Sequence, residues 1–333
     1  MNESPSNVLE LQGVTVRYGR GHRAFTAVDS VDLVVPRRRT LGLVGESGCG
    51  KSTLARAIVG LVPMSGGKLL LDGSEVASGH AGRGKSFRRR VQLVFQDPNA
   101  SLNPRMAIGD MLNEALSMRG NQMSAIERRA EAVRTLDLVG IGPKALERYP
   151  HQFSGGQKQR LAIARALAVS PELLVLDEVT SALDVSVQAT ILNLLRELQA
   201  ELGLSMLFIS HDLAVVRYIS DTVGVMYLGQ IVETAPTPSL FDSPDHPYTR
   251  ALLQSVPRLS HKANALRGVG DPPDLRDPPS GCRYHTRCAI GPLANPERTI
   301  CMIDQPALDG SETHLVACHF AGSRAAAQQV GVD

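Results

Sequence analysis

A glycine-rich loop at residues 42–53, GLVGESGCGKST, places the strongest limit on how this chain can fold. It fits the pattern G-x-x-x-x-G-K-S/T at Gly45, Gly50, Lys51 and Ser52. An apolar run predicts a strand before the loop, and apolar residues at helical spacing predict a helix after it. In that setting backbone N–H groups close around phosphate oxygens, and the helix dipole favours the anion. The motif therefore predicts a strand–loop–helix unit that binds a nucleotide.

The nucleotide-binding prediction covers the whole loop, because a phosphate cradle uses main-chain groups along its length. Lys51 is expected to reach the β- and γ-phosphates, and the hydroxyl of Ser52 to ligate Mg²⁺. We interpret Cys49 as a small residue that exposes its backbone N–H. The predicted nucleotide-binding residues of the loop are Gly45, Glu46, Ser47, Gly48, Cys49, Gly50, Lys51, Ser52 and Thr53.

Two adjacent carboxylates end a later apolar run, LLVLDE, at residues 173–178. Taken alone, this is an acidic strand end, a common feature at the edge of a sheet. Together with a phosphate loop, Asp177 suits the coordination sphere of Mg²⁺, and Glu178 is placed to polarise an attacking water. The run therefore predicts hydrolysis of the bound nucleotide as well as binding.

The order of apolar patterns along the chain predicts an α/β fold. Alternation in VDSVDLVV, residues 28–35, is typical of a half-buried antiparallel strand. Helical patterns dominate residues 98–149, and strand and helix then alternate, which favours a parallel sheet. We expect a P-loop NTPase core with a mainly parallel sheet, an N-terminal antiparallel β subdomain, an inserted helical subdomain and a proline-rich, cysteine-containing C-terminal extension.

The composition changes along the chain, and this change places the domain boundary near Ala235, where proline becomes frequent. Residues 1–235 are expected to form the nucleotide-binding domain, with its helical subdomain at about 97–155. Residues 236–333 are expected to form the C-terminal extension.

Charge and hydropathy exclude several classes of protein. The formal net charge is +2, which does not indicate binding to nucleic acid, and the arginine clusters at 37–39 and 88–90 are interpreted as solvated faces. The N-terminus lacks the features of a signal peptide. No apolar run approaches the roughly 18 residues of a membrane helix. We expect a cytosolic chain that meets a membrane only through a partner.

A second glycine pair begins another helical pattern in FSGGQKQRLAIARAL, residues 153–167. With the phosphate loop, LDE, SALD and FISHD, this segment resembles the ATP-binding subunit of ABC transporters, in which the same motifs follow in the same order. The resemblance covers roughly residues 8–257. It implies that Ser154, Gly155 and Gly156 bind the γ-phosphate held on the loop of a second subunit. The isolated chain is then expected to bind ATP but to hydrolyse it poorly.

The resemblance also implies roles for residues outside the two glycine motifs. Tyr18 matches the aromatic residue that stacks on adenine, although a buried strand tyrosine is the alternative. Gln96 matches a glutamine that touches Mg²⁺, and His211 matches a histidine that contacts the γ-phosphate. The implied catalytic residues are Glu178, His211, Lys51 and Gln96, and the implied Mg²⁺ ligands are Ser52, Gln96 and Asp177.

Two residues depart from the family pattern. Phe153 opens the second glycine motif where leucine is commonest, and it keeps an apolar anchor. Val179 follows Glu178 where proline is usual, which loosens a backbone constraint beside the predicted catalytic carboxylate.

Finer features resemble the dipeptide and oligopeptide importer ATPases, a group that includes nickel importers. They are FQDPNASLNPR at residues 95–105 and SPDHPYTRALLQSVP at residues 243–257. The resemblance implies a second ATPase subunit, either related or identical, two transmembrane permease subunits, and an extracytoplasmic solute-binding protein. The implied location is the cytoplasmic face of the membrane. The alternatives are a soluble ABC-type ATPase without transport function and a regulatory subunit with weak hydrolysis.

Four of the five cysteines lie in the last 52 residues, at Cys282, Cys288, Cys301 and Cys318. GCRYHTRC and VACHF resemble the C-terminal segment of the same subfamily, in which some members carry a 4Fe–4S cluster, and four cysteines match its thiolate count. Zinc is an alternative, although the paired cysteine spacing typical of structural zinc is absent. The nearby histidines are His285, His314 and His319. Free thiols packed under loops are the third reading.

Overall fold

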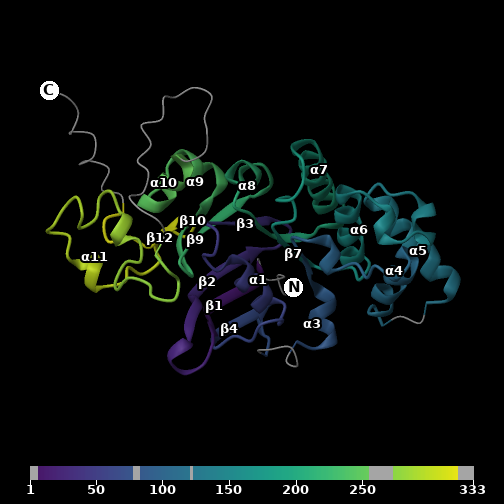
Figure 1. The fold of residues 1–333 in the computed structure, drawn as a ribbon, viewed down its shortest axis with the longest axis horizontal. Coiled ribbons are helices and arrows are strands. Elements are labelled where there is room, and N and C mark those ends of the chain that lie inside the picture. Colours follow the sequence, from purple (N-terminus) through teal and green to yellow (C-terminus); the bar gives the residue numbers. More distant parts are fainter. Residues whose placement is uncertain (1–6, 78–82, 121–122, 255–272, 322–333) are drawn as a thin grey trace, which may run out of the picture.

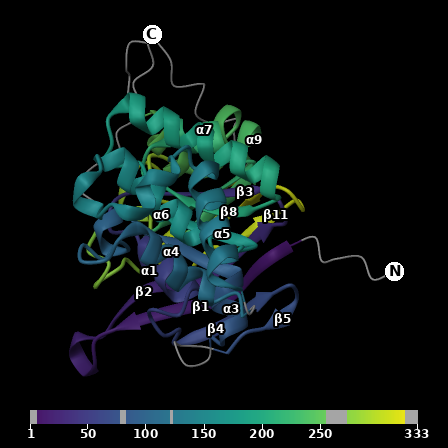
Figure 2. The ribbon, with the colours of Figure 1, turned by 90° about the vertical axis from the view of Figure 1, so that its right-hand side faces the viewer.

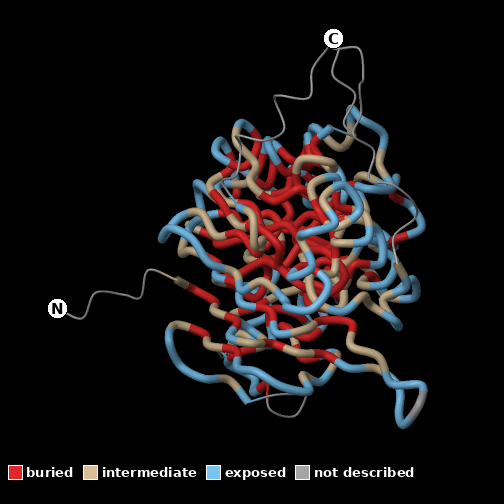
Figure 3. The backbone as a smooth tube through the Cα atoms, turned by 90° about the vertical axis from the view of Figure 1, so that its left-hand side faces the viewer, coloured by how far each residue is buried: buried red, intermediate tan, exposed pale blue. Residues whose placement is uncertain are grey.

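A computed structural model describes residues 7–77, 83–120, 123–254 and 273–321, and these residues are organised around two β-sheets. Figure 1 shows the sheets in the middle of the molecule, a group of teal helices at one end and the yellow C-terminal segment at the other. Figure 3 shows the buried segments gathered in the interior, with exposed loops around them.

The larger sheet is parallel through its centre. In spatial order its strands are β11 (Asp309–Gly310), β12 (Leu315–Val316), β10 (Gln230–Pro236), β9 (Thr222–Tyr227), β3 (Thr40–Val44), β8 (Ser205–Ile209), β7 (Leu173–Asp177) and β6 (Val91–Val94). Neighbours from β9 to β6 run parallel, whereas β10 pairs antiparallel with both β9 and β12. Every residue of β3, β7 and β8 is buried, as expected for strands covered on both faces. The predicted mainly parallel sheet is confirmed.

The smaller sheet is antiparallel and forms the predicted N-terminal β subdomain. Its strands are β2 (Phe25–Pro36), β1 (Asn7–Tyr18), β4 (Gly66–Leu71) and β5 (Ser74–Glu75). Leu11 pairs with Leu33 across β1 and β2. Both leucines join Leu43 of β3 and Leu54 of helix α1 (Lys51–Ile58) in one hydrophobic cluster. This cluster holds the loop between β3 and α1 against both sheets.

A helical insertion separates β6 from β7, as predicted. Its helices are α4 (Ile108–Ser117), α5 (Ala125–Leu138) and α6 (Gly155–Leu167), with short 3-10 turns at Pro98–Ala100, Pro143–Glu147 and Pro150–Gln152. Ser124 and Glu127 exchange hydrogen bonds at the start of α5, a reciprocal cap that satisfies two backbone donors. Leu112 of α4, Leu136 of α5 and Leu161 of α6 belong to the main hydrophobic cluster, so the insertion is continuous with the core.

The C-terminal extension returns to the edge of the larger sheet, because Leu315 and Val316 of β12 pair with Thr234 and Glu233 of β10. Figure 2 shows α7 and α9 on the opposite side of the larger sheet from the smaller sheet. The other helices and 3-10 turns are α3 (Lys85–Arg90), α7 (Val185–Leu202), α8 (Leu213–Ile219), α9 (Thr237–Asp242), α10 (Pro247–Gln254), α11 (Ile300–Ile303), Gly21–Arg23 and His285–Arg287. Within the described residues, none of these helices is both long and apolar enough to cross a membrane.

The arginine clusters are not simply solvated faces, as the sequence had suggested. Arg37 and Arg90 both pair with Asp72 and with Glu172, and the Arg90 Nε to Glu172 Oε1 distance is 2.6 Å. The Arg90 hydrogen bond lowers the pKa of Glu172. The network joins the smaller sheet to the edge of the larger one, which a charge pattern alone could not reveal.

Candidate functional site

The phosphate loop connects the end of β3 to the start of α1. Gly50 precedes the helix with φ of 111°, and a Cβ there would lie 2.4 Å from the carbonyl oxygen of Ala27, so only glycine fits. Lys51 Nζ donates hydrogen bonds to the carbonyl oxygens of Gly45 and Glu46, each at 2.9 Å, and the residue is only 3% exposed. Its ammonium group therefore lies within the loop that is predicted to cradle phosphates.

Ser52 and Asp177 form the second part of the site. Ser52 Oγ donates a hydrogen bond to Asp177 Oδ1 at 2.8 Å. Burial raises the pKa of Asp177, and the hydrogen bond from Ser52 opposes that shift. A hydroxyl beside a carboxylate supplies the hard oxygen ligands that Mg²⁺ prefers. The pair therefore fits the predicted Mg²⁺ site.

Three predicted catalytic side chains meet near the carboxyl ends of β6, β7 and β8. Glu178 Oε2 accepts a hydrogen bond from Gln96 Nε2 at 3.3 Å and lies 3.4 Å from His211 Nδ1. Gln96 Nε2 also donates to Ser181 Oγ at 3.1 Å. The carboxyl ends of neighbouring parallel strands lie on the same side of a sheet, which is why residues far apart in the sequence form one group.

The backbone at Glu178 has a positive φ of 49°, an uncommon conformation for a residue other than glycine. Its N–H donates to the carbonyl oxygen of Ile209 at 3.0 Å, which ties it to β8. The next residue, Val179, is 1% exposed and belongs to the main hydrophobic cluster. Packing of Val179 therefore restrains the backbone where the family pattern has proline.

The second glycine-led helix start lies on the surface, at the beginning of α6. Ser154 caps the helix and exchanges hydrogen bonds with Gln157 of the first turn, and both Ser154 and Gly155 are exposed. A Cβ on Gly156 would lie 2.5 Å from Cγ1 of Val187 in α7. Close packing of α6 against α7 therefore requires glycine at this position.

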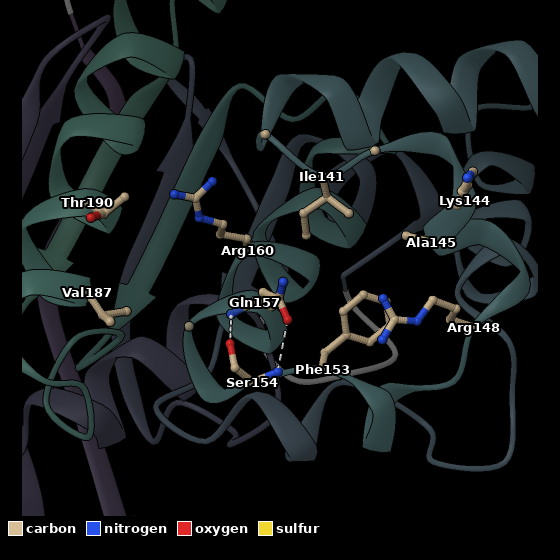
Figure 4. Close-up of a pocket in the computed structure, with 13 residues that line it drawn as sticks. Ile141, Lys144, Ala145, Arg148, Phe153, Ser154, Gln157, Arg160, Val187 and Thr190 are labelled. Atoms are coloured by element: carbon tan, nitrogen blue, oxygen red, sulfur yellow. Dashed lines mark hydrogen bonds between the residues drawn. The ribbon is translucent and has the colours of Figure 1, made fainter.

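A cavity of about 490 Å³ adjoins this helix start (Figure 4). Phe153, Arg148 and Arg160 are among the residues that line it. The Arg148 guanidinium lies 4.4 Å from the centre of the Phe153 ring, so the apolar anchor predicted at this position is packed under a cation. Figure 1 shows α6 displaced from α1 along the long axis of the molecule, so the two glycine-led helices lie apart.

Tyr18 lies at the end of β1, half-buried, with its ring 5.7 Å from that of Phe25. This packing agrees equally with an adenine-stacking residue and with a structural strand tyrosine. Its role stays a prediction.

Tyr248 of α10 is a neighbour of the phosphate loop that the sequence analysis did not identify. Its Oη accepts a hydrogen bond from the N–H of Glu46 at 2.9 Å, and the residue is 1% exposed. A tyrosine within an apolar helical segment is expected to be buried, and a buried tyrosine hydroxyl needs a hydrogen-bond partner, so the sequence did indicate that Tyr248 has one. The sequence did not indicate which partner.

The four cysteines of the extension converge on one small cavity. Its lining includes Cys282, Cys288, Cys301 and Cys318, together with His246, Tyr284, His285 and His319. The Cys282 N–H donates to the carbonyl oxygen of Cys301 at 2.9 Å. Burial raises the pKa of Cys282 to about 12 and that of Cys288 to about 11.

The donor set of this cavity suits a cluster, but its geometry does not. The enclosed volume is about 10 Å³, roughly what one water molecule needs. Among the described residues, no group of three or more His, Cys, Asp or Glu side chains is arranged to hold a metal ion. His314 binds Glu233 at 2.8 Å instead of lining the cavity. The structure therefore does not support the metal centre that the sequence suggested.

Comparisons with known proteins agree with this architecture. A family described as ABC transporter matches residues 28–181, and one described as oligopeptide/dipeptide transporter, C-terminal region, matches residues 232–291. A relative from Brucella abortus (strain 2308), named as a peptide import ATP-binding protein, is 49% identical over 90% of this chain and 88% of its own length. A Brucella ovis relative with the same description is 47% identical over 87% and 91%.

Solved structures show the same fold. CbiO1 of Clostridium perfringens, part of the ABC transporter complex CbiONQ, aligns with a TM-score of 0.64 and 28% identity over 72% of this chain and 92% of that one. The ATP-binding cassette MJ0796, in a dimeric state bound to ADP and Pi, aligns with a TM-score of 0.62 and 28% identity over 69% and 98%. The chain therefore belongs to the ABC transporter ATP-binding proteins, in the group that carries the oligopeptide/dipeptide transporter C-terminal region.

Proposed function

We propose that this chain is the ATP-hydrolysing subunit of an ABC importer for dipeptides, oligopeptides or related small solutes. The grouping of Glu178, Gln96 and His211 at the sheet edge that also carries the Ser52–Asp177 pair is the observation that supports hydrolysis. The relatives named for peptide import support the class of solute.

In this proposal Tyr18 stacks on the adenine, and the phosphate loop holds the phosphates through its N–H groups and Lys51. Bound Mg²⁺ supplies charge neutralisation on the phosphate oxygens, and Ser52, Asp177 and Gln96 would hold it. Glu178 orients a water molecule for in-line attack. His211 and Lys51 stabilise the charge that develops on the transferring phosphoryl group.

A complete site requires a second subunit, either a related ATPase or another copy of this chain. Ser154 and Gly155 are exposed at the start of α6, and a helix N-terminus at the surface suits an anion presented from outside the chain. We infer that Ser154, Gly155 and Gly156 bind the γ-phosphate held on the partner's loop. The dimeric state of the MJ0796 cassette supports this pairing.

The membrane partners follow from the same proposal. The pair of ATPases would lie at the cytoplasmic face of the membrane, beneath two permease subunits that receive solute from an extracytoplasmic binding protein. The helical insertion at about 97–155 of domain 1–235 would transmit closure through Gln96. The extension, residues 236–333, would be a separate domain along the sequence, although its strand β12 pairs with β10 of the larger sheet.

Co-purification with the permease subunits, followed by an ATPase assay in reconstituted membranes, tests the function. We expect a stable complex in which peptide with its binding protein stimulates hydrolysis. A chain that co-purifies with ribosomes or DNA, and with no permease, would be a soluble ABC ATPase. A complex whose hydrolysis survives removal of this chain's Glu178 carboxylate would assign it a regulatory role.

We propose that a 4Fe–4S cluster would bind at the cysteine cavity only in a more open form than the one described here. Four thiols from distant positions line the cavity, but its present volume is about 10 Å³. Iron, sulfide and zinc analysis of anaerobically purified protein distinguishes the three readings. Stoichiometric iron and sulfide support the cluster, zinc alone supports a zinc site, and colourless metal-free protein establishes free thiols.

A further inference from the structure

The segment that carries two of the tail cysteines contacts the phosphate loop directly. Arg287 donates hydrogen bonds from both terminal nitrogens to both carboxylate oxygens of Glu46, at 2.9 and 3.1 Å. The side chains of Arg287 and Glu46 are 11% and 29% exposed. A bidentate, largely desolvated pair of this kind fixes orientation as well as distance. The two residues are 241 positions apart in the sequence.

Glu46 is held at every polar group it has. Its side chain binds Arg287, its N–H donates to Tyr248 Oη, and its carbonyl oxygen accepts from Lys51 Nζ. One residue therefore links Arg287 to the ammonium that is expected to hold the outer phosphates. Arg287 and Lys51 thus bind the side chain and the carbonyl oxygen of the same residue.

The connection between the tail and the loop is closely packed. The rings of Tyr227, Tyr248 and Tyr284 pack mutually at 4.6 to 5.4 Å, and all three residues are at most 3% exposed. The Arg287 guanidinium lies 5.9 Å from the ring centres of both Tyr227 and Tyr284. Arg283, in the same segment, binds the carbonyl oxygen of Leu228 and the carboxylate of Asp29. A packed aromatic unit transmits displacement instead of absorbing it.

Arg287 is also adjacent to Cys288, whose side chain lines the cysteine cavity with Cys282, Cys301 and Cys318. We propose that Arg287 is a positioning residue for the phosphate loop. A change in the side chains that line the cysteine cavity would alter the affinity of this chain for ATP, and the effect would pass through Arg287. The inference rests on the proposed ATP site and extends it to the regulation of that site.

The test is MgATP binding to the full-length chain, measured by calorimetry beside thermal unfolding. Arg287→Ala is expected to weaken binding about tenfold, the size typical of a positioning contact outside a site. Glu46→Ala should weaken it similarly, and the double variant should bind no more weakly than either single variant. Arg287→Lys should recover part of the affinity. Unchanged affinity in Arg287→Ala, or additive losses in the double variant, would overturn the proposal.

Ser311→Ala is the matched control in the same extension. Ser311 Oγ accepts a hydrogen bond from the His314 N–H at 3.0 Å, and neither residue lines the cysteine cavity. It should lower the unfolding temperature and leave MgATP affinity within twofold of wild type. An equal loss of affinity in this variant would show that general integrity of the tail matters, and not the Arg287 contact. If Arg287→Ala does not fold, Glu46→Ala tests the same contact from the other side.

Cys318→Ser tests the link to the cavity, since Cys318 lies 31 residues beyond Arg287 in the sequence. We expect weaker MgATP binding in the wild-type background and no further weakening in the Arg287→Ala background. An equal loss in both backgrounds contradicts transmission through Arg287. Wild-type protein that binds no MgATP would overturn the proposed function itself, whereas equal binding by wild type and Arg287→Ala overturns only this inference.

Discussion

The two glycine-led helix starts of this chain differ in how much of a site each one contains. At α1, Lys51 is 3% exposed, and Ser52 already binds the carboxylate of Asp177. At α6, Ser154 and Gly155 are exposed to solvent. The first start already binds side chains of its own chain, whereas the second lies exposed at the surface. The difference supports a molecule that carries one half of each of two sites.

The largest expected effect concerns the catalytic residues beside the phosphate loop. Glu178→Gln should leave MgATP binding intact and reduce hydrolysis by ~10²–10⁴-fold, the usual cost of losing a general base. The measurement is turnover of the assembled complex in which the partner's own site is disabled. Glu197→Gln, an exposed change on α7, is the control and should leave turnover unaltered. Near-normal turnover of Glu178→Gln would remove this carboxylate from the mechanism.

A change at the second glycine-led helix start, at α6, should affect hydrolysis without affecting ATP binding by the isolated chain. Ser154→Ala removes a group predicted to face the partner's γ-phosphate, and hydrolysis by the complex should fall by about 10²-fold, as for loss of one donor aimed at developing charge. MgATP affinity of the isolated chain should not change, since its own phosphate loop is untouched. A loss of affinity in the isolated chain would place both glycine motifs at the same nucleotide and end the comparison.

Substitutions at two neighbouring glycines of α6 test whether glycine is required there for packing against α7. Gly156→Ala should lower the free energy of unfolding by about 1–3 kcal/mol, because the new Cβ would lie 2.5 Å from Val187. Gly155→Ala places its Cβ at an ordinary 3.9 Å from Leu183 and serves as the control. Val187→Ala should restore stability to Gly156→Ala. Denaturant unfolding of the wild type and these three variants checks this, and equal effects at the two glycines would rule out the steric explanation.

The smallest effect concerns the stability of the nucleotide-free chain. Burial raises the pKa of Asp177, so the carboxyl favours folding when protonated, and that contribution is lost as the pH rises through its raised pKa. Asp177→Asn should therefore unfold at a higher temperature than wild type at neutral pH, and the gap should close in acid. Its Mg²⁺-dependent hydrolysis should nevertheless decrease. A gap independent of pH would show that the charge of Asp177 is not the cause.

Much of the fold could be predicted from local pattern. The alternation of strand and helix expected after residue 149 matches β7, α7 and β8, and α7 is clear because its apolar spacing is long and regular. The hairpin of β9 and β10 was not predicted, since both strands are nearly continuous buried runs without alternation. The arginine network around Asp72 was also missed, because ion pairs between distant segments leave no periodic signal.

The sequence by itself determined the phosphate loop, the paired carboxylates, the helical insertion and the family. These features depend on neighbouring residues or on a fixed order of motifs, so they can be recognised in the linear sequence. Only the tertiary structure brought Glu178, Gln96 and His211 together, gathered four cysteines around one small cavity, and placed Arg287 against Glu46. Those contacts join segments tens to hundreds of residues apart, and they exist only because the strand order and the packing of the extension bring those segments together in space.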